Sequence, residues 1–296
     1  MRRRKYKVKK MTLLAYLSFI VLCIGMIYPF ICIVSVSFTS AEEINRRGFW
    51  IWPERIDTSA YAYLSMDPSS ILEAYGTTIF VAIVGTVVGG IVSALYAYAI
   101  SRASFPLRRP LAFFAMFTMF FSGGMASKYI IIVSVLKMKN SIWALILPIA
   151  FSVMNMIIMR AYFEQLPYGV AESAKIDGAS EYKIFTQIMI PLAKPALATI
   201  CLTLFVNYWN AYYEAMMYMD TDSYVTIQLL LQRLLLNASF YKTLASSGMM
   251  SELVKDIPSD ALCMAVCVIS VMPMLLIFPS FQKYFVKGMA IGAVKE

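Results

Sequence analysis

The chain has 296 residues, of which 60% are hydrophobic and 15% charged, whereas a soluble domain usually carries about 25% charged residues. This composition argues against a soluble protein, and the lack of histidine and of any CxxC pair leaves no expected catalytic or metal-binding residue. The formal net charge of +9 does not call for a nucleic acid as partner, because the basic residues gather beside apolar blocks.

Long apolar blocks predict an all-α polytopic membrane protein. A run of about 18 or more apolar residues is long enough to cross the hydrocarbon core of a bilayer as a helix. We expect six transmembrane helices, the third with an uncertain continuation. Their approximate bounds are Met11–Ser37, Tyr75–Ile100, Leu111–Phe121, Ser141–Met159, Ala196–Met219 and Ala261–Phe281.

The charges predict that both termini are cytoplasmic. The N-terminal sequence MRRRKYKVKK directly precedes the first block, and a basic segment there acts as a topology signal that stays inside. The block behind it is longer than the roughly 7–15 apolar residues of a signal peptide. With six spans, Lys and Arg outnumber acidic residues in the segments placed inside, whereas acidic residues outnumber basic ones in the outer loops.

The first outer loop and the second block carry positional signals. Phe49, Trp50 and Trp52 suit the boundary between membrane and water, where aromatic side chains are enriched. Gly85, Gly89 and Gly90 in the second block would let another helix approach its backbone closely, and Gly85 and Gly89 have the GxxxG spacing used in membrane helix packing. The second span is therefore predicted to pack inside the protein more than against lipid.

Two apolar stretches are too short to span alone, since a span needs roughly 20 residues. The third block, LAFFAMFTMFF, is interrupted by SGGMASK before YIIIVSVL resumes. We expect a helix that stops near the outer face, followed by a short helix against the bundle. After the fifth span, Gln228, Gln232 and Arg233 break the apolar pattern, which favours an amphipathic helix on the outer side.

Residues 164–191, between the fourth and fifth spans, predict a helix, a bend and a second helix. Leu166-Pro167 favours a helix start. Ala171–Ile176 is expected to form a short helix with Glu172 in its first turn, where the helix dipole favours a carboxylate. Gly178 permits a bend that a residue with a Cβ would resist.

The second helix is predicted to be anchored by one apolar face. Pro191 and Pro195 end it and start the next span. Connections in compact proteins usually run about two to eight residues, so a pair of helices pinned by prolines is a stiff element that can transmit force. Four apolar residues recur at helical spacing: Tyr182, Phe185, Ile188 and Met189.

The same segment resembles the cytoplasmic signature loop of bacterial ABC-importer permeases. That loop reads Glu-Ala-Ala, three residues, Gly, nine residues, Ile, one residue and Leu-Pro. The matching positions here are Glu172-Ser173-Ala174, Gly178, Ile188 and Ile190-Pro191. Ser173 and Ile190 depart conservatively from that pattern. The core Asp177-Gly178-Ala179 and the C-terminal sequence FQKYFVKGMAIGAVKE resemble the branch that imports sugars, specifically permeases for oligosaccharides.

The resemblance implies that this coupling helix pair docks on a separate cytoplasmic ATPase and transmits its closure to the spans. The chain has no G-x-x-x-x-G-K-[ST] loop to hold phosphates. It is therefore expected to bind no cofactor and not to be an enzyme, with ATP and Mg²⁺ on the partner. The residues expected to couple to the ATPase are Glu172, Ser173, Ala174, Asp177, Gly178, Ala179, Tyr182, Phe185, Ile188 and Pro191.

The implied assembly lies in the bacterial cytoplasmic membrane. It contains a second permease, usually a different chain, two copies of the ATPase and an extracytoplasmic substrate-binding protein. Within this chain, residues 1–74 would hold the basic segment, first span and outer loop. Residues 75–282 would form the permease core with the coupling loop 164–191, and residues 283–296 a cytoplasmic tail.

The fifth span is the predicted substrate passage, because polar groups inside lipid are costly and mark a pathway. Amides and carboxylates bind sugar hydroxyls, and aromatic rings pack on the C–H faces of sugars. The alternative interpretation is an interfacial aromatic belt with amides joining helices. Thr203, Asn207, Asn210 and Glu214 recur on one helical stripe, flanked by aromatic residues that include Trp209 and Tyr213.

Three other functions remain as alternatives. An amino-acid, peptide or phosphate importer would share the signature loop but not its sugar-like core and tail. An intramembrane transferase would need clustered carboxylates or histidines at a membrane face, and an ion-coupled transporter would need more intramembrane charges. The sugar itself is not specified, although Lys128, Lys137, Lys139 and Arg233 on the outer side would tolerate an acidic oligosaccharide.

Overall fold

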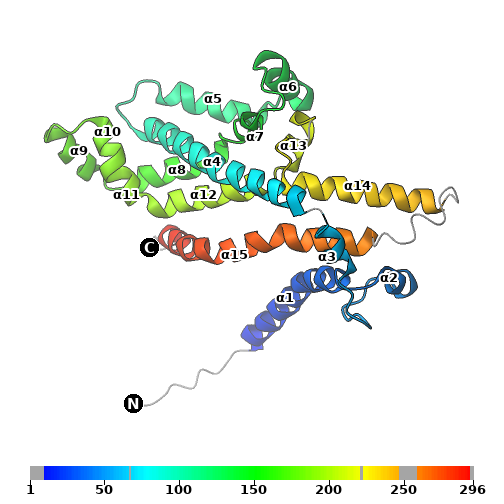
Figure 1. Ribbon diagram of the computed structural model, residues 1–296. Helices are drawn as coiled ribbons and strands as arrows, with labels where there is room; N and C mark the ends of the chain where they lie inside the picture. The colour runs from blue at the N-terminus through cyan, green and yellow to red at the C-terminus, as the bar shows by residue number, and fades with distance from the viewer. Residues whose placement is uncertain (1–9, 67, 221–222, 247–258, 294–296) are drawn as a thin grey trace. The chain divides into compact units, whose positions relative to one another are not determined.

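Figure 1 shows the computed structural model, which describes residues 10–66, 68–220, 223–246 and 259–293. Every regular element in these ranges is a helix, as predicted. The basic segment before Lys10 and the last three residues of the predicted tail lie outside the described residues. Two compact units form, one from Met1–Pro68 with Arg233–Met272 and one from Ser69–Gln232 with Pro273–Glu296.

The first unit centres on a long apolar helix whose surface is almost entirely exposed. Residues Thr12–Val36 of α1 are long and apolar enough to cross a membrane. Ser40 caps α2 by accepting a hydrogen bond from the Glu43 backbone, and a small core of Val36 and its neighbours joins the helices. The helices are α1 (Lys10–Val36), α2 (Ala41–Arg47), α3 (Ser59–Leu64), the end of α14 (Ile227–Ser246) and the start of α15 (Ser259–Ala293).

The second unit holds the predicted coupling and passage segments. Its elements from α4 to the start of α14 are coloured cyan to yellow in Figure 1, and the end of α15, drawn in red, also belongs to it. They are α4 (Pro68–Ser101), α5 (Arg108–Phe120), α6 (Gly124–Ile130), the π-helix η1 (Ile131–Val135), α7 (Ile142–Ile146), α8 (Val153–Gln165), α9 (Tyr168–Ile176), α10 (Glu181–Ile184), the π-helix η2 (Phe185–Met189), α11 (Ile190–Leu192), α12 (Lys194–Trp209) and α13 (Tyr212–Tyr218).

Three described helices are long and apolar enough to span a membrane, and two bent pairs raise the number to five if each pair is one span. One such pair is the predicted third block, in which Arg108–Phe120 and Gly124–Val135 meet at 117°. The break falls at the Gly-Gly pair, and Gly124 has a φ of +75°. The expected interruption of this block is therefore confirmed.

The predicted fourth and fifth spans are not continuous helices, so the sequence interpretation was wrong about them. The fourth is divided into α7 and α8, and Ser152 caps the restarted helix by accepting from the Asn155 backbone. The fifth is divided into α12, which ends at Trp209, and α13, which begins at Tyr212. A break of this kind is tolerated where protein groups take up the freed backbone.

The predicted close approach to the second span is confirmed at two glycines of α4. A Cβ on Gly85 would lie 2.4 Å from the ring of Tyr208, and one on Gly89 would lie 2.8 Å from the carbonyl oxygen of Ala150. The approaching groups are thus a tyrosine ring of α12 and the backbone of the α7–α8 break. Small residues on α4 let these segments reach its axis.

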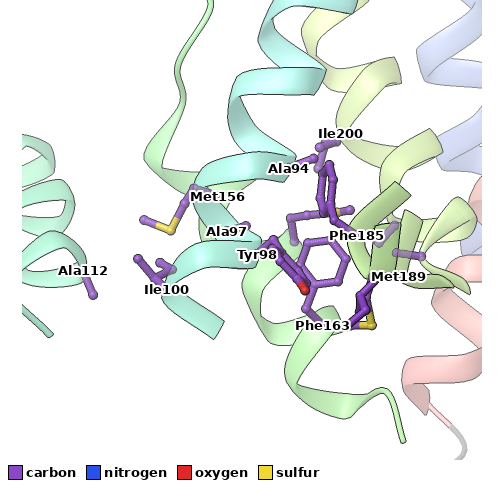
Figure 2. Close-up of a cluster of buried hydrophobic side chains, with 14 of the residues drawn as sticks. Ala94, Ala97, Tyr98, Ile100, Ala112, Met156, Phe163, Phe185, Met189 and Ile200 are labelled. Atoms are coloured by element: carbon purple, nitrogen blue, oxygen red, sulfur yellow. The ribbon is translucent and has the colours of Figure 1, made fainter. Parts of the chain in front are cut away.

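A cluster of buried side chains near the C-terminal end of α4 includes residues of the coupling segment. Figure 2 shows Tyr98 of α4 beside Phe163 of α8 and Phe185 of η2. The ring centroids of Tyr98 and Phe185 are 5.0 Å apart, and those of Tyr98 and Phe163 are 5.8 Å apart. This core fixes the coupling segment to the helices that precede and follow it.

Candidate functional site

The bend of the coupling segment lies at Gly178, whose backbone is in the left-handed conformation and ends the first helix. Its φ is +80°, a conformation that a residue with a Cβ adopts only at a cost. The Ala179 amide donates to the Ala174 carbonyl at 2.9 Å, and the Gly178 amide donates to the Lys175 carbonyl at 3.1 Å. This pair of hydrogen bonds is a Schellman motif, so the predicted bend has a defined geometry. Ser180 then caps α10 by accepting from the Lys183 backbone.

The first arm, α9, begins earlier than predicted. It runs from Tyr168 rather than Ala171, because Pro167 provides the start. Glu172 therefore lies in the second turn, and the expected stabilisation by the helix dipole does not apply. Ala171 is buried and Ala174 half-buried against the core. These small side chains bring α9 close to the bundle, whereas Glu172 points into solvent.

The second arm buries most of the face that the periodicity predicted, but not Tyr182. Tyr182 is 76% exposed, whereas Ile184, Phe185 and Met189 are buried and Ile188 is half-buried. The cause is η2, a π-helix over Phe185–Met189. Its wider turn holds one more residue than an α-helical turn, which shifts the register of the face. The prediction that Tyr182 anchors this arm is wrong.

The outward face of the coupling pair combines apolar and charged side chains. Ile176 is 82% exposed and Tyr182 is 76% exposed, on either side of the bend. The side chains of Glu172, Ser173 and Asp177 are also exposed nearby in sequence. Exposed large apolar side chains rimmed by polar residues mark protein–protein contact surfaces. We call these five residues the outward face.

Glu181 connects the two arms to each other and to α4. Its Oε1 accepts from Lys175 Nζ of α9 at 2.9 Å, and its Oε2 accepts from the Tyr98 hydroxyl at 2.8 Å. The segment Glu181–Leu192 turns away from α12 by 82°. The hydrogen bond from Lys175, and next the one from Tyr98, lower the pKa of Glu181 below its ordinary value. The carboxyl group therefore stays ionised at physiological pH.

The predicted passage residues divide between two helices. Thr203, Asn207 and Asn210 are exposed along α12 and its end, but Asn210 already leaves the helix as its C-cap. Glu214 and Tyr213 lie on α13 and are half-buried. The single continuous stripe expected from the sequence is therefore wrong beyond Asn210. The break brings Glu214 to a second helix that starts at Tyr212.

Trp209 does not lie on the exposed side of α12. It is 2% exposed, and its ring stacks on Phe205 with centroids 5.9 Å apart. Both rings belong to a buried cluster with Tyr208 and Leu204. Trp209 thus faces the core of the second unit, and its packing corrects the expectation that it would line the same side as Asn207.

Gln228 is a polar neighbour that the sequence interpretation did not assign to the passage. Its Nε2 lies 3.4 Å from Asn210 Oδ1, and Asn210 Nδ2 donates to the Val206 carbonyl at 2.9 Å. The side-chain amide of Asn207 makes no hydrogen bond within the described part of the chain. The spacing of Gln228 and Gln232, four residues apart on an otherwise apolar helix, was the signal in the sequence.

A contact between two chain-distant segments lies next to α13. Lys139 forms an ion pair with Asp220, and the Asp220 amide donates to Asn140 Oδ1 at 2.8 Å. The hydrogen bond to Asp220 raises the pKa of Lys139. The positive charge of Lys139 is therefore balanced by the carboxylate of Asp220. Lys128 and Lys137 make no ion pair among the described residues. Of the three lysines predicted to tolerate an acidic sugar, two remain available for it.

One family of membrane transport proteins matches this chain over residues 87–291. Its description is the binding-protein-dependent transport system inner membrane component. The chain belongs to this family. The matched residues include the signature loop, both halves of the broken fifth span and most of α15. The assignment made from the loop sequence is thereby confirmed, and the chain is an integral membrane component of a transport system.

Known members of the family match nearly the whole chain. It is 37% identical to the polygalacturonan/rhamnogalacturonan transport system permease protein YtcP of Bacillus subtilis, over 94% of this chain and 95% of that protein. It is 36% identical to the protein LplC of the same organism, over 91% and 89% of the two chains. The similarity thus extends over both the coupling segment and the passage segment.

A solved structure shares the fold of this permease. A chain of a bacterial ABC transporter involved in the import of the acidic polysaccharide alginate superposes with a TM-score of 0.81. The match covers 96% of this chain and 100% of that chain, at 28% identity. This chain therefore shares its overall helical fold with a chain of a solved transporter.

Proposed function

We propose that this chain is a permease subunit of an ATP-driven, binding-protein-dependent importer that moves an oligosaccharide into the cell. The family supplies the transport role. Relatives that transport polygalacturonan or rhamnogalacturonan, and a similar structure from an alginate importer, favour a sugar. No observation favours an amino-acid, peptide or phosphate importer, so the sugar remains the single candidate substrate class.

The observation that carries this proposal is the coupling segment. Its Schellman stop at Gly178 fixes the bend, Phe185 and Met189 anchor the second arm, and Ile176 and Tyr182 stand exposed on either side. A stiff element that buries one face and presents another suits docking to a moving partner. The partner is a cytoplasmic ATPase that holds ATP and Mg²⁺, and its two copies would serve this chain and a second permease.

The proposed arrangement has six spans with both termini in the cytoplasm of a bacterium. The bent pair at 117° and the divided fourth and fifth blocks are counted as one span each. Residues 1–74 carry the first span and outer loop, residues 75–282 the permease core, and residues 283–296 the tail. An extracytoplasmic binding protein delivers the sugar to the outer side.

The proposed passage is lined by side chains of α12, α13 and α14. Thr203, Asn207 and Asn210 offer hydroxyl and amide groups on the exposed side of α12, and these groups can replace the water bound to sugar hydroxyls. Glu214 and Tyr213 extend this surface on α13. Closure of the ATPase would shift a two-state bundle between outward-open and inward-open forms.

Changes of the outward face test the coupling function. The chain is produced with its partner permease and ATPase, and the amount of ATPase that co-purifies is measured. Ile176→Glu and Tyr182→Glu should each remove most of the ATPase, because a carboxylate would be buried in the contact. Ile176→Val, which keeps the apolar surface, should retain it. Full retention of the ATPase by both Glu variants would contradict docking at this face.

Uptake tests the substrate class. Membrane vesicles that hold the assembled transporter and its binding protein receive a labelled galacturonate oligosaccharide, a labelled maltooligosaccharide or a labelled amino acid. ATP-dependent uptake of either sugar supports the proposal. Uptake of the amino acid alone would overturn the sugar assignment and leave the coupling function intact.

A further inference from the structure

The coupling segment is joined to α4 by a buried tyrosine. Tyr98 is 8% exposed, and its hydroxyl donates to Glu181 of α10 at 2.8 Å. The same hydroxyl accepts from Arg102 Nη2 at 2.8 Å, and the Arg102 guanidinium lies 4.6 Å from the centre of the Tyr98 ring. Hydrogen bonds to an ionised carboxylate are about twice as strong as neutral ones. A movement of α10 is therefore resisted at Tyr98.

The ring of Tyr98 adds an apolar connection to the same place. Figure 2 shows its ring beside the rings of Phe163 and Phe185, with centroids at 5.8 Å and 5.0 Å. Phe185 belongs to η2, the arm that continues from α10. The coupling segment is thus held to α4 by a charge-assisted hydrogen bond and by ring packing, in addition to its own chain connections.

The other end of α4 is hydrogen-bonded to α14. The Thr78 hydroxyl accepts from the backbone amide of Ile227 at 2.8 Å and donates to the Ala74 carbonyl at 2.7 Å. Ile227 is the first residue of α14, and amides of a first turn have no partner inside their own helix. Thr78 is 1% exposed. The start of α14 is therefore attached to α4 at a buried hydroxyl that both accepts and donates a hydrogen bond.

A continuous helix separates these two attachments. Thr78 and Tyr98 both lie in α4, which runs without a break from Pro68 to Ser101. Twenty residues of α-helix cover about 30 Å, the thickness of the hydrocarbon core. The residue after Ile227 is Gln228, whose side chain meets Asn210 at the proposed passage.

We propose that α4 is a second output of the coupling segment, in which Tyr98 transmits the movement of Glu181 to α4 and Thr78 transmits it to the start of α14. This rests on the proposed function, since the ATPase supplies the movement. The consequence is that closure of the ATPase changes the position of Gln228 at the far end of the passage. The chain-continuous route from α10 through η2 and α11 to α12 remains the first output.

The test uses the complete complex with its ATPase and a reporter at position 228. Gln228→Cys is labelled with a membrane-impermeant maleimide, first without nucleotide and then with the ATPase trapped by ATP and vanadate. The chain without this substitution gives the background from the native cysteines. We expect trapping to change the labelling rate, and no sugar is needed for this measurement.

Tyr98→Phe then removes one hydroxyl and keeps the ring. It should reduce the nucleotide-dependent change in labelling rate by roughly tenfold, the effect of losing one hydrogen bond to a charged acceptor. Tyr96→Phe is the matched control, because Tyr96 lies two residues away on α4 and its hydroxyl donates to the Leu111 carbonyl at 3.0 Å. Tyr96→Phe should leave the change intact. Equal changes in the two variants would overturn the proposal.

Thr78→Val tests the outer attachment, and Thr78→Ser restores the hydroxyl. Thr78→Val should reproduce the loss seen with Tyr98→Phe, and Thr78→Ser should reverse it, which a purely structural defect would not explain. The double variant Tyr98→Phe/Thr78→Val should lose no more than the larger single loss, because both residues act on one route. The proposal would be overturned if the two losses multiplied in the double variant. It would also be overturned if trapping the ATPase did not change the labelling rate of Gln228→Cys in the otherwise wild-type chain. Failure of the wild-type complex to retain its ATPase would instead refute the proposed function.

Discussion

The hydroxyl of Tyr208 donates a hydrogen bond of 2.7 Å to the backbone carbonyl of Ile146, 62 positions away in the chain. Ile146 is the last residue of α7, where the predicted fourth span breaks and a carbonyl loses its helical partner. Tyr208 is 1% exposed, and its ring fits against α4 only because Gly85 has no side chain. A broken span, a tyrosine and a glycine thus form one packing unit.

Gly85→Ala should lower the thermal stability of the purified chain. The added Cβ would meet the Tyr208 ring at 2.4 Å, and overpacking of this kind costs about 1–3 kcal/mol. Gly76→Ala is the matched control on the same helix, because a Cβ there has no heavy atom within 4 Å. Thermal unfolding in detergent measures both. A Gly85 variant as stable as the Gly76 variant would contradict the packing described for Tyr208.

Gly178→Ala should strain the bend of the coupling segment. No atom lies within 4 Å of the added Cβ, so the cost comes only from the backbone φ of +80° and amounts to roughly 1–2 kcal/mol. We expect weaker co-purification of the ATPase with little change in the stability of the bundle. Gly169→Ala, an exposed position of α9 with equally open surroundings, should retain the ATPase. The same loss in both variants would argue against a special role of the bend.

The structure of the second arm predicts a large loss of stability at one of its aromatic residues and almost none at another. Phe185→Ala should destabilise the chain by about 3–5 kcal/mol, because its ring is buried in the core around Tyr98. Tyr182→Ala should change the unfolding free energy by no more than about 0.5 kcal/mol, since the side chain is exposed. Thermal unfolding of the two variants compares them directly. A loss of stability for Tyr182→Ala as large as that for Phe185→Ala would return Tyr182 to the buried face predicted from an α-helical period.

The sequence was sufficient for the helical class, for the bend and for the family, because each depends on local chemistry. Gly178 takes the positive φ that ends the first arm, and the Gly-Gly pair at residues 123–124 breaks the third block as predicted. The register of the second arm was not predictable in this way. A π-helical turn at Phe185–Met189 leaves no mark in a pattern of apolar spacing, because tertiary packing selects it.

The passage was predicted less well for a related reason. A helical stripe that includes Thr203 and Glu214 assumes an unbroken helix, but the chain leaves the helix at Asn210 without a proline or glycine to announce it. The partner of Asn210 is Gln228, 18 residues further on. Long-range contacts of this kind depend on the assembled fold. Trp209 packs inward for the same reason, since the core around Phe205 takes up its ring.

Asn210→Leu and Gln228→Leu should lower sugar uptake while leaving assembly unchanged. Both side chains present amide groups at the junction of α12, α13 and α14. Loss of one hydrogen bond to a sugar hydroxyl should raise the apparent KM of uptake by roughly five- to tenfold. The readout is uptake of a labelled galacturonate oligosaccharide by vesicles with the assembled transporter.

Asn237→Leu is the control, since Asn237 is another exposed amide on α14, and it should leave uptake at the wild-type level. The alternative role of the amides is to join helices. In that case Asn210→Leu and Gln228→Leu would lower thermal stability and leave the KM unchanged. The passage assignment therefore depends on a KM effect at positions 210 and 228 that is absent at position 237.

Glu214→Gln extends the test to substrate charge, because removal of this carboxylate should favour uptake of an acidic sugar over a neutral one.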